Sequence, residues 1–355
     1  MRTAADTPLP TPTTNWPARL KELAFETSDR AGPLFVLLLV VAVFGIAEPQ
    51  RFLTALNLGN VAGQTAVLAV AAVGMTFIII SGGIDLSVGS VVALAGVYAA
   101  MVLAEGYGLV LGLTAGLATG AVCGLVNGLI ITRGHLPPFI VTLGMMEIVR
   151  GLALESANGM PVTNLPRAFS RIGNAVLEIP LGASAIYIPY SLFILLPVAL
   201  GAAFVLRYTV FGTHVYAVGS NEQTARLCGV NVGRVKTLVY VISGLLTGLA
   251  GIMYASRLNT GQPSEGVGME LEVIAAVVVG GGSLMGGKGS ILGSVVGAFI
   301  IKFLRNGCVV AGVSPFIQRI IIGLIIIAAV WADHHRRQFL MKRIKSRQPA
   351  AQKPI

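Results

Sequence analysis

The strongest constraint on the fold is a series of long apolar runs that recurs along the 355-residue chain. Runs such as residues 61–80 and 109–132 have the length, roughly 20 residues, that crosses the hydrocarbon core of a bilayer as a helix. Hydrophobic residues make up 55% of the chain and charged residues only 11%, whereas soluble domains average about 25% charged residues. We therefore predict an all-α polytopic membrane protein, a transmembrane helical bundle.

We expect about ten spans, and divide the chain into an N-terminal tail (1–30), a membrane domain (31–332) and a basic C-terminal tail (333–355). The expected spans are residues 31–48, 61–80, 86–104, 109–132, 137–155, 187–206, 237–256, 269–282, 290–306 and 314–332. The eighth is short and Gly-rich, so we expect a broken or re-entrant segment. Such backbone survives at membrane depth only when protein or water surrounds it.

Basic residues predict the orientation of the chain, whose net charge is +10. They gather in the segment 207–236 and in the tail after residue 332, which the positive-inside rule places in the cytoplasm. Four spans separate the two regions, so the count agrees, and counting backward places the N-terminus inside as well. The loop 156–186 then faces the opposite side. We attribute the positive charge to this topology, expect the basic tail to contact anionic lipid of the bilayer, and expect no nucleic-acid partner, because no recognisable binding module accompanies the charge.

The stretch SGGIDLSVGS at residues 81–90 places a carboxylate between two apolar runs. Gly82 and Gly83 are expected to end one helix, and Asp85 or Ser87 can cap the next. The alternative is that Asp85 belongs to a translocation path or gate, because ionisable groups in membrane segments are costly and mark function. Both interpretations stay open.

Several membrane segments carry polar side chains. Asn127 and Thr142 are expected to form hydrogen bonds between helices or to line a polar cavity, and Gln64 belongs to the same class. Glu147 and Arg150 lie three residues apart and are expected to neutralise each other, with contact to substrate as the alternative. With Asp85 and Ser87, Asn127 and Thr142 are our candidates for the path.

A glycine-rich stretch, GGGSLMGGKGS at residues 280–290, resembles a nucleotide-binding P-loop at first sight. The pattern requires Ser or Thr after the lysine, but Gly289 stands there, and apolar segments flank the stretch on both sides. We therefore expect tight glycine turns, with Lys288 marking the inner face, and no nucleotide. The structural turn residues in the two stretches are Gly82, Gly83, Gly282, Gly286 and Gly287.

Small residues also recur every four positions at Gly116, Gly120 and Gly124. This spacing lets a second helix approach closely. We expect packing within one bundle, with a dimer face as the alternative. The three cysteines show no metal-ligand spacing, and no catalytic Ser/His/Asp set or carboxylate pair is visible, so neither a metal site nor an enzyme is expected.

The polar stretch 217–236 predicts a short helix outside the membrane. Asn221 can cap it, Glu222 and Arg226 have the favourable four-residue spacing, and Gly229 can end it. Such a helix is either an ordinary surface helix or a docking site for another protein.

Six stretches together resemble the permease subunits of bacterial ABC importers for monosaccharides, of the ribose, xylose and arabinose type. These belong to a larger permease family shared with branched-chain amino acid importers. The matching stretches are SGGIDLSVGS (81–90), GLVNGLIITR (124–133), LPPFIVTLGM (136–145), YAVGSNEQTARLCGVNVGRVK (216–236), SGLLTGLAGIMYASR (243–257) and GGGSLMGGKGS (280–290). The resemblance covers roughly residues 35–335.

The resemblance implies a multi-pass protein of the bacterial cytoplasmic membrane that translocates a sugar inward without being an enzyme itself. A separate ATPase subunit would use ATP and Mg²⁺, a periplasmic sugar-binding protein would deliver the sugar, and a second permease subunit, expected to be an identical copy, would complete the path. The coupling helix that docks on the ATPase would comprise Asn221, Glu222, Ala225, Arg226 and Gly229. The alternative is a secondary transporter for a small polar solute, driven by an ion gradient.

Overall fold

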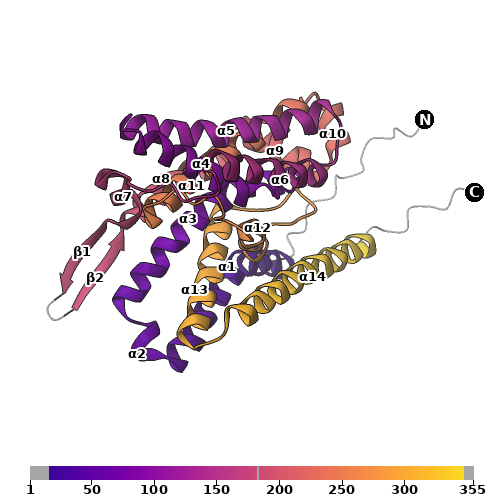
Figure 1. Cartoon of the computed structure of the whole chain (residues 1–355). Coiled ribbons are helices and arrows are strands. Elements are labelled where there is room, and N and C mark those ends of the chain that lie inside the picture. The colour runs from indigo at the N-terminus through magenta and orange to yellow at the C-terminus, as the bar shows by residue number, and fades with distance from the viewer. Residues whose placement is uncertain (1–15, 182–183, 348–355) are drawn as a thin grey trace, which may run out of the picture.

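The computed structural model describes residues 16–181 and 184–347 as a helical bundle (Figure 1). Each of the ten predicted segments contains a helix, and the predicted fold class is confirmed. These helices are α1 (Trp16–Ala47), α3 (Ala55–Ile80), α4 (Val88–Ala104), α5 (Leu109–Arg133), α6 (Pro138–Ser156), α8 (Tyr190–Tyr208), α11 (Val232–Leu258), α12 (Met269–Val279), α13 (Ile291–Val310) and α14 (Pro315–Arg347). Of the two predicted tails, residues 1–15 and 348–355 lie outside the described residues.

By length and composition, α3, α5, α8, α11 and α13 can each cross a membrane, and shorter apolar helices lie in α1, α4 and α14. The eighth predicted segment is indeed interrupted. Its helix α12 has 11 residues, about 16 Å of helix, and the chain leaves it at Gly280 for a glycine-rich turn. Helix α6 carries Glu147, Arg150 and Glu155, so the count of ten spans remains a prediction.

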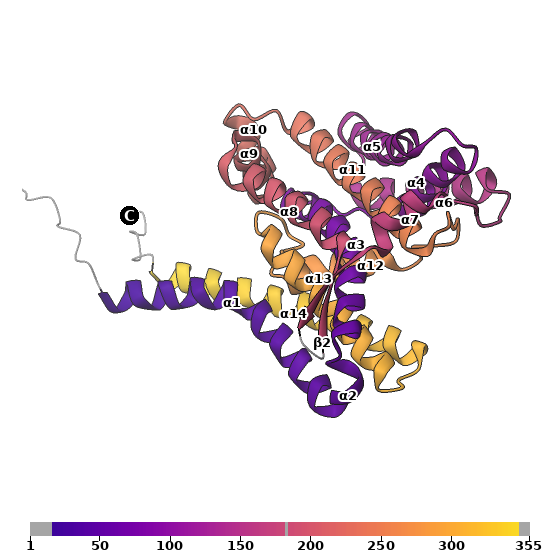
Figure 2. The ribbon, with the colours of Figure 1, turned by 90° about the vertical axis from the view of Figure 1, so that its left-hand side faces the viewer.

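Helix α3 occupies the centre of the molecule, with α8, α11 and α13 around it (Figure 2). In its most apolar window 94% of the residues are buried, against 17% for α8. Its run from Ala66 to Ile80 contains only apolar residues and Thr76, so every face can pack against a neighbouring helix. Helix α3 is therefore a core helix, whereas α8 lies at the periphery.

Four shorter helices and a hairpin complete the described chain. They are α2 (Pro49–Phe52), α7 (Arg167–Asn174), α9 (Val210–Ser220), α10 (Glu222–Leu227) and the antiparallel strands β1 (Val176–Leu181) and β2 (Ser184–Pro189). The hairpin projects from the bundle in Figure 1 and was not predicted. Strand β2 occupies the first residues of the predicted span 187–206, so α8 begins at Tyr190 instead.

The small-residue stripe of α5 packs within the bundle, as expected. A Cβ added at Gly120 would overlap the carbonyl of Gly244, and one at Gly124 would overlap the carbonyl of Tyr240. The partner helix is α11, which contributes its own glycines, Gly244 and Gly248, to the same seam. Backbones at this separation gain dispersion contacts that larger side chains would prevent.

Candidate coupling and translocation sites

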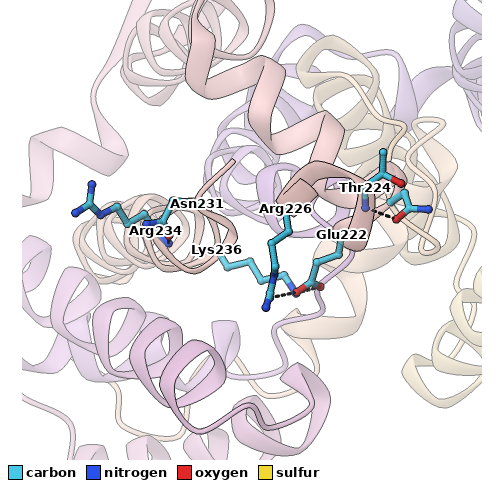
Figure 3. Close-up of polar contacts among 7 residues, drawn as sticks. Glu222, Thr224, Arg226, Asn231, Arg234 and Lys236 are labelled. Atoms are coloured by element: carbon cyan, nitrogen blue, oxygen red, sulfur yellow. Dashed lines mark hydrogen bonds and ion pairs between the residues drawn. The ribbon is translucent and has the colours of Figure 1, made fainter. Parts of the chain in front are cut away.

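Helix α10 forms as the sequence predicts (Figure 3). The Asn221 side chain accepts a hydrogen bond from the backbone N–H of Thr224 at 2.9 Å, which caps the helix. Glu222 and Arg226 form an ion pair at 3.4 Å, and Gly229 has a φ of +84° where the helix has ended. Glycine reaches that backbone region without a Cβ clash.

Two further contacts fix α10 to the rest of the protein. Ala225 is buried against the main hydrophobic core, while Arg226 on the same helix is exposed. Lys236, from the first turns of α11, donates from Nζ to the second carboxylate oxygen of Glu222 at 2.6 Å. The sequence analysis missed this pair, because 14 positions separate the two residues and no helical spacing rule connects them. Glu222 thus bridges one local and one distant cation.

The start of α10 sits on a meeting point of three backbone segments, residues 80–83, 219–220 and 286–289, which we term the glycine junction. The N–H of Gly287 donates to the carbonyl of Ile80 at 2.8 Å. A Cβ added at Gly219 would overlap the same Ile80 carbonyl, so the backbones touch directly. Tyr216, in α9, donates its hydroxyl to the carbonyl of Gly289 at 2.8 Å. The junction therefore connects the α9–α10 link to the C-terminal end of α3 and to the last residues of the turn that precedes α13.

The five glycines named in the two turns differ in what requires a glycine at each position. Gly82, Gly286 and Gly287 have φ values of +81°, +81° and +72°, which an L side chain rarely adopts. Gly83 and Gly282 lack a positive φ, but a Cβ at either one would crowd a neighbour within 3 Å, the Tyr240 hydroxyl or the Val277 side chain. Residues 280–290 connect two helices, not a strand and a helix as a P-loop does.

The four candidates for the path lie together in one buried polar group. Asp85 accepts hydrogen bonds at Oδ1 from the backbone N–H and the hydroxyl of Ser87, at 2.8 and 2.6 Å. Asn127, from α5, donates to the Ser87 hydroxyl at 3.1 Å. Tyr240 in α11 donates to the carbonyl of Ile84 at 3.3 Å. Thr142 in α6 shares its one hydroxyl proton between that carbonyl, also at 3.3 Å, and the carbonyl of Pro138 in its own helix, at 3.0 Å. Three helices therefore hold the turn between α3 and α4.

The structure alters the predicted cap of α4. Ser87 occupies the N-cap position, but its side chain makes no capping hydrogen bond. A capping side chain accepts a hydrogen bond from a backbone N–H in the first turn of the helix. Asp85 instead accepts from the N–H of Ser87, the N-cap residue itself. The expectation of a simple N-cap at Asp85 or Ser87 is therefore wrong. Asn127 Oδ1 is buried and has no hydrogen-bond partner in the described part of the chain.

Two other polar expectations also need correction. Arg150 does not pair with Glu147. Its guanidinium donates to the carbonyls of Pro263 and Glu265, at 2.7 and 2.6 Å, in the loop between α11 and α12. Gln64 is exposed and so differs from Asn127 and Thr142, which bond across helices. Arg150 thus fixes a connecting loop, because a charged donor satisfies two backbone carbonyls at once.

The structure adds an ion cluster that the sequence analysis missed. Glu272 in α12 pairs with Lys302, at 2.8 Å, and with Arg305, both in α13. Glu272 and Lys302 are largely withdrawn from the surface. The carboxylate lies 30 positions from its nearest basic partner, so only the packing of α12 on α13 reveals the cluster. In the described residues, no group of three His, Cys, Asp or Glu side chains is placed to hold a metal ion.

Comparison with known proteins identifies the chain's relatives. Residues 57–330 match the family model described as a branched-chain amino acid transport system permease component. The ribose import permease protein RbsC of Escherichia coli is 42% identical over 305 residues, which covers 86% of this chain and 93% of that protein. RbsC of Bacillus subtilis is 41% identical, covering 87% and 94%. The L-arabinose ABC transporter permease protein AraH of Azospirillum brasilense is 38% identical, covering 90% and 92%.

No solved structure matches the chain. The family model, by contrast, spans most of it, and the relatives align over nearly their whole length. The apolar helices of the bundle agree with both findings. The chain is a multi-pass membrane protein, and it belongs to the family of transport-system permease components.

Proposed function

We propose that this chain is the membrane-spanning subunit of an ABC importer that moves a monosaccharide across the cytoplasmic membrane. The relatives above are named as ribose import permeases and an L-arabinose ABC transporter permease, and their alignments cover 86–90% of this chain. Helix α10 is the observation that carries the mechanism. This helix is short and capped, and it exposes Arg226 and Leu227. On its inner side the buried Ala225 and the ion pair of Glu222 with Lys236 hold it against the rest of the protein.

The proposed partners follow from this assignment. A cytoplasmic ATPase receives α10 and supplies the ATP and Mg²⁺ chemistry, while a periplasmic binding protein delivers the sugar on the opposite side. A second copy of this chain completes the path. Both termini then lie in the cytoplasm, together with α10 and the glycine junction.

The glycine junction explains how movement of α10 reaches the membrane helices. Backbone atoms of Gly219, Ile80 and Gly287 are in direct contact, so little side-chain flexibility separates them. A displacement of α10 by the ATPase therefore moves the end of α3 and the turn before α13 together. The Asp85 group lies a few residues beyond Gly82 and closes the turn into α4. It is buried here, and we assign it to the gate.

The test is reconstitution of the chain with its ATPase and sugar-binding protein in vesicles. A Glu222→Ala/Arg226→Ala double variant is expected to weaken assembly or to uncouple ATP hydrolysis from uptake, with normal expression. The matched control for expression and for assembly with the ATPase is Glu178→Ala/Arg171→Ala, two exposed residues on β1 and α7 in the loop that faces the side opposite α10. Unchanged assembly and uptake in the α10 variant would remove the coupling assignment. Uphill sugar uptake by the chain alone, without nucleotide, would favour an ion-driven transporter instead.

A further inference from the structure

A groove with a volume of about 480 Å³ opens between the C-terminal end of α5 and the N-terminal end of α11. This volume lies within the range of roughly 300–1,000 Å³ that small-molecule sites occupy. The groove is separate from the Asp85 group and from the ion pairs of α10. Its lining includes Leu129, Thr132 and Arg133 from α5 and Arg234, Thr237 and Leu238 from α11.

The two walls of the groove have the same order of side chains. In α5, Arg133 ends the helix and Leu129 lies four residues further in. In α11, Arg234 is in the first turn and Leu238 lies four residues further in. Four helical residues correspond to about 6 Å along the axis. The groove therefore has a cationic rim and an apolar interior, separated by one helical turn.

The polar groups of the groove favour an anionic occupant. Arg133 and Arg234 are both exposed, and neither forms an ion pair with a carboxylate of the described chain. In Figure 3, Arg234 points to the opposite side of α11 from Lys236, away from Glu222. The hydroxyls of Thr132 and Thr237 lie 3.1 Å apart between the two helices. Arginine guanidinium groups bind phosphate oxygens in a bidentate manner.

We propose that this groove binds an anionic phospholipid of the cytoplasmic leaflet. Its phosphate lies between Arg133 and Arg234, and the start of an acyl chain lies on Leu129 and Leu238. Basic pockets between membrane helices on the cytoplasmic side are typical sites for such headgroups. A free phosphate ion would use the arginines but would gain nothing from the leucines. The side of the membrane rests on the proposed function, which places α10 and the adjacent start of α11 in the cytoplasm.

Native mass spectrometry of the purified chain in detergent micelles tests this site. Phosphatidylglycerol is titrated into the wild type and the Arg133→Gln/Arg234→Gln variant. We expect an approximately 30-fold weaker dissociation constant in the variant, because each arginine near an anionic headgroup contributes about fivefold to binding. The Arg133→Lys/Arg234→Lys variant keeps the charge and is expected to retain most of the binding. The control Arg167→Gln/Arg171→Gln removes two exposed arginines from α7 and is expected to bind as the wild type does.

Equal phosphatidylglycerol binding by the wild type and the glutamine variant would overturn the proposal, as would equally tight binding of phosphatidylethanolamine. Complete displacement of the lipid by excess inorganic phosphate would show a free-anion site and would also overturn it. The lipid is counted on the chain alone, so assembly with an ATPase is a separate measurement. If the wild-type chain fails to assemble with an ATPase while the arginine variant still loses the lipid, the lipid site is supported and only the proposed function is contradicted.

Discussion

Two glycine-rich turns, residues 81–87 between α3 and α4 and residues 280–290 between α12 and α13, meet at the glycine junction. Side chains hold the first turn. Asp85 and Ser87 bond each other, and donors from α5, α6 and α11 reach the turn. Much of the second turn's contact with the junction is made by backbone atoms, through Gly286 and Gly287.

The difference teaches which kind of substitution each turn tolerates. A turn held by buried hydrogen bonds is sensitive to the chemistry of its side chains, since a buried donor without an acceptor costs about 1–3 kcal/mol. A turn held by backbone contact is sensitive to added volume, because neither backbone can give way without moving a helix. The first turn is therefore best tested with isosteric variants of its side chains, and the contact of the second turn with the junction is best tested by adding a methyl group.

The largest effect is expected from an added methyl group at the junction. Gly219, in α9, lies against both turns. In Gly219→Ala the new Cβ would overlap the carbonyl oxygen of Ile80 and lie 2.8 Å from the backbone nitrogen of Gly287, so α9 must separate from α3 and from the second turn. Overpacking of this kind costs about 1–3 kcal/mol. We expect a lower folded yield and loss of most sugar uptake. Thermal unfolding in detergent and uptake in vesicles measure the two effects.

The matched control for the junction is Gly201→Ala in α8. A Cβ there meets nothing within 4 Å. In the interior of a helix, alanine is favoured over glycine by about 0.5–1 kcal/mol. This control should unfold at the same temperature as the wild type or slightly higher. If the two alanine variants behave alike, direct backbone contact at Gly219 is not what holds the junction.

The next effect, of similar size on stability but with a different signature, is expected at Asp85. Asp85→Ala leaves the N–H and hydroxyl of Ser87 without their acceptor and should destabilise the protein by about 1–3 kcal/mol. Asp85→Asn keeps an acceptor oxygen, so we expect near-normal folded yield. If Asp85 belongs to the gate, this variant still loses uptake, which a transport assay on matched protein amounts measures. Wild-type uptake by Asp85→Asn would restrict the residue to a structural role.

The sequence predicted those parts of the fold and site that depend on local pattern. Apolar runs located the ten helices, and the spacing of Asn221, Glu222, Arg226 and Gly229 gave α10 with its cap, ion pair and terminus. The glycines of both turns were recognised from composition. These features depend on neighbours within a few positions, which is the range over which helical periodicity and turn chemistry act.

The parts that the sequence did not predict depend on tertiary contacts. Arg150 has Glu147 one turn away, but it donates to carbonyls of a loop more than 100 positions later. Glu272 in α12 forms ion pairs with Lys302 and Arg305 of α13. Most of the hairpin β1–β2 lies in the predicted loop 156–186, and only the end of β2 was taken for the start of an apolar span, because short apolar segments fit a strand or a helix equally well. Sequence spacing says nothing about such partners.

The smallest effect separates the two cations that bind Glu222. The Arg226 side chain is 66% exposed and Lys236 only 19%. Exposed helical pairs with four-residue spacing contribute about 0.3–0.5 kcal/mol, so Arg226→Met should hardly change thermal stability. Lys236→Met breaks the shorter pair, at 2.6 Å, which holds α10 to α11. We expect a larger fall in the unfolding temperature for Lys236→Met, and weaker ATPase assembly for both variants, because Arg226 faces outward and Lys236 sets the position of α10. If Arg226→Met destabilises the isolated chain more than Lys236→Met does, α10 is stabilised mainly from within, and the bridge to α11 is secondary.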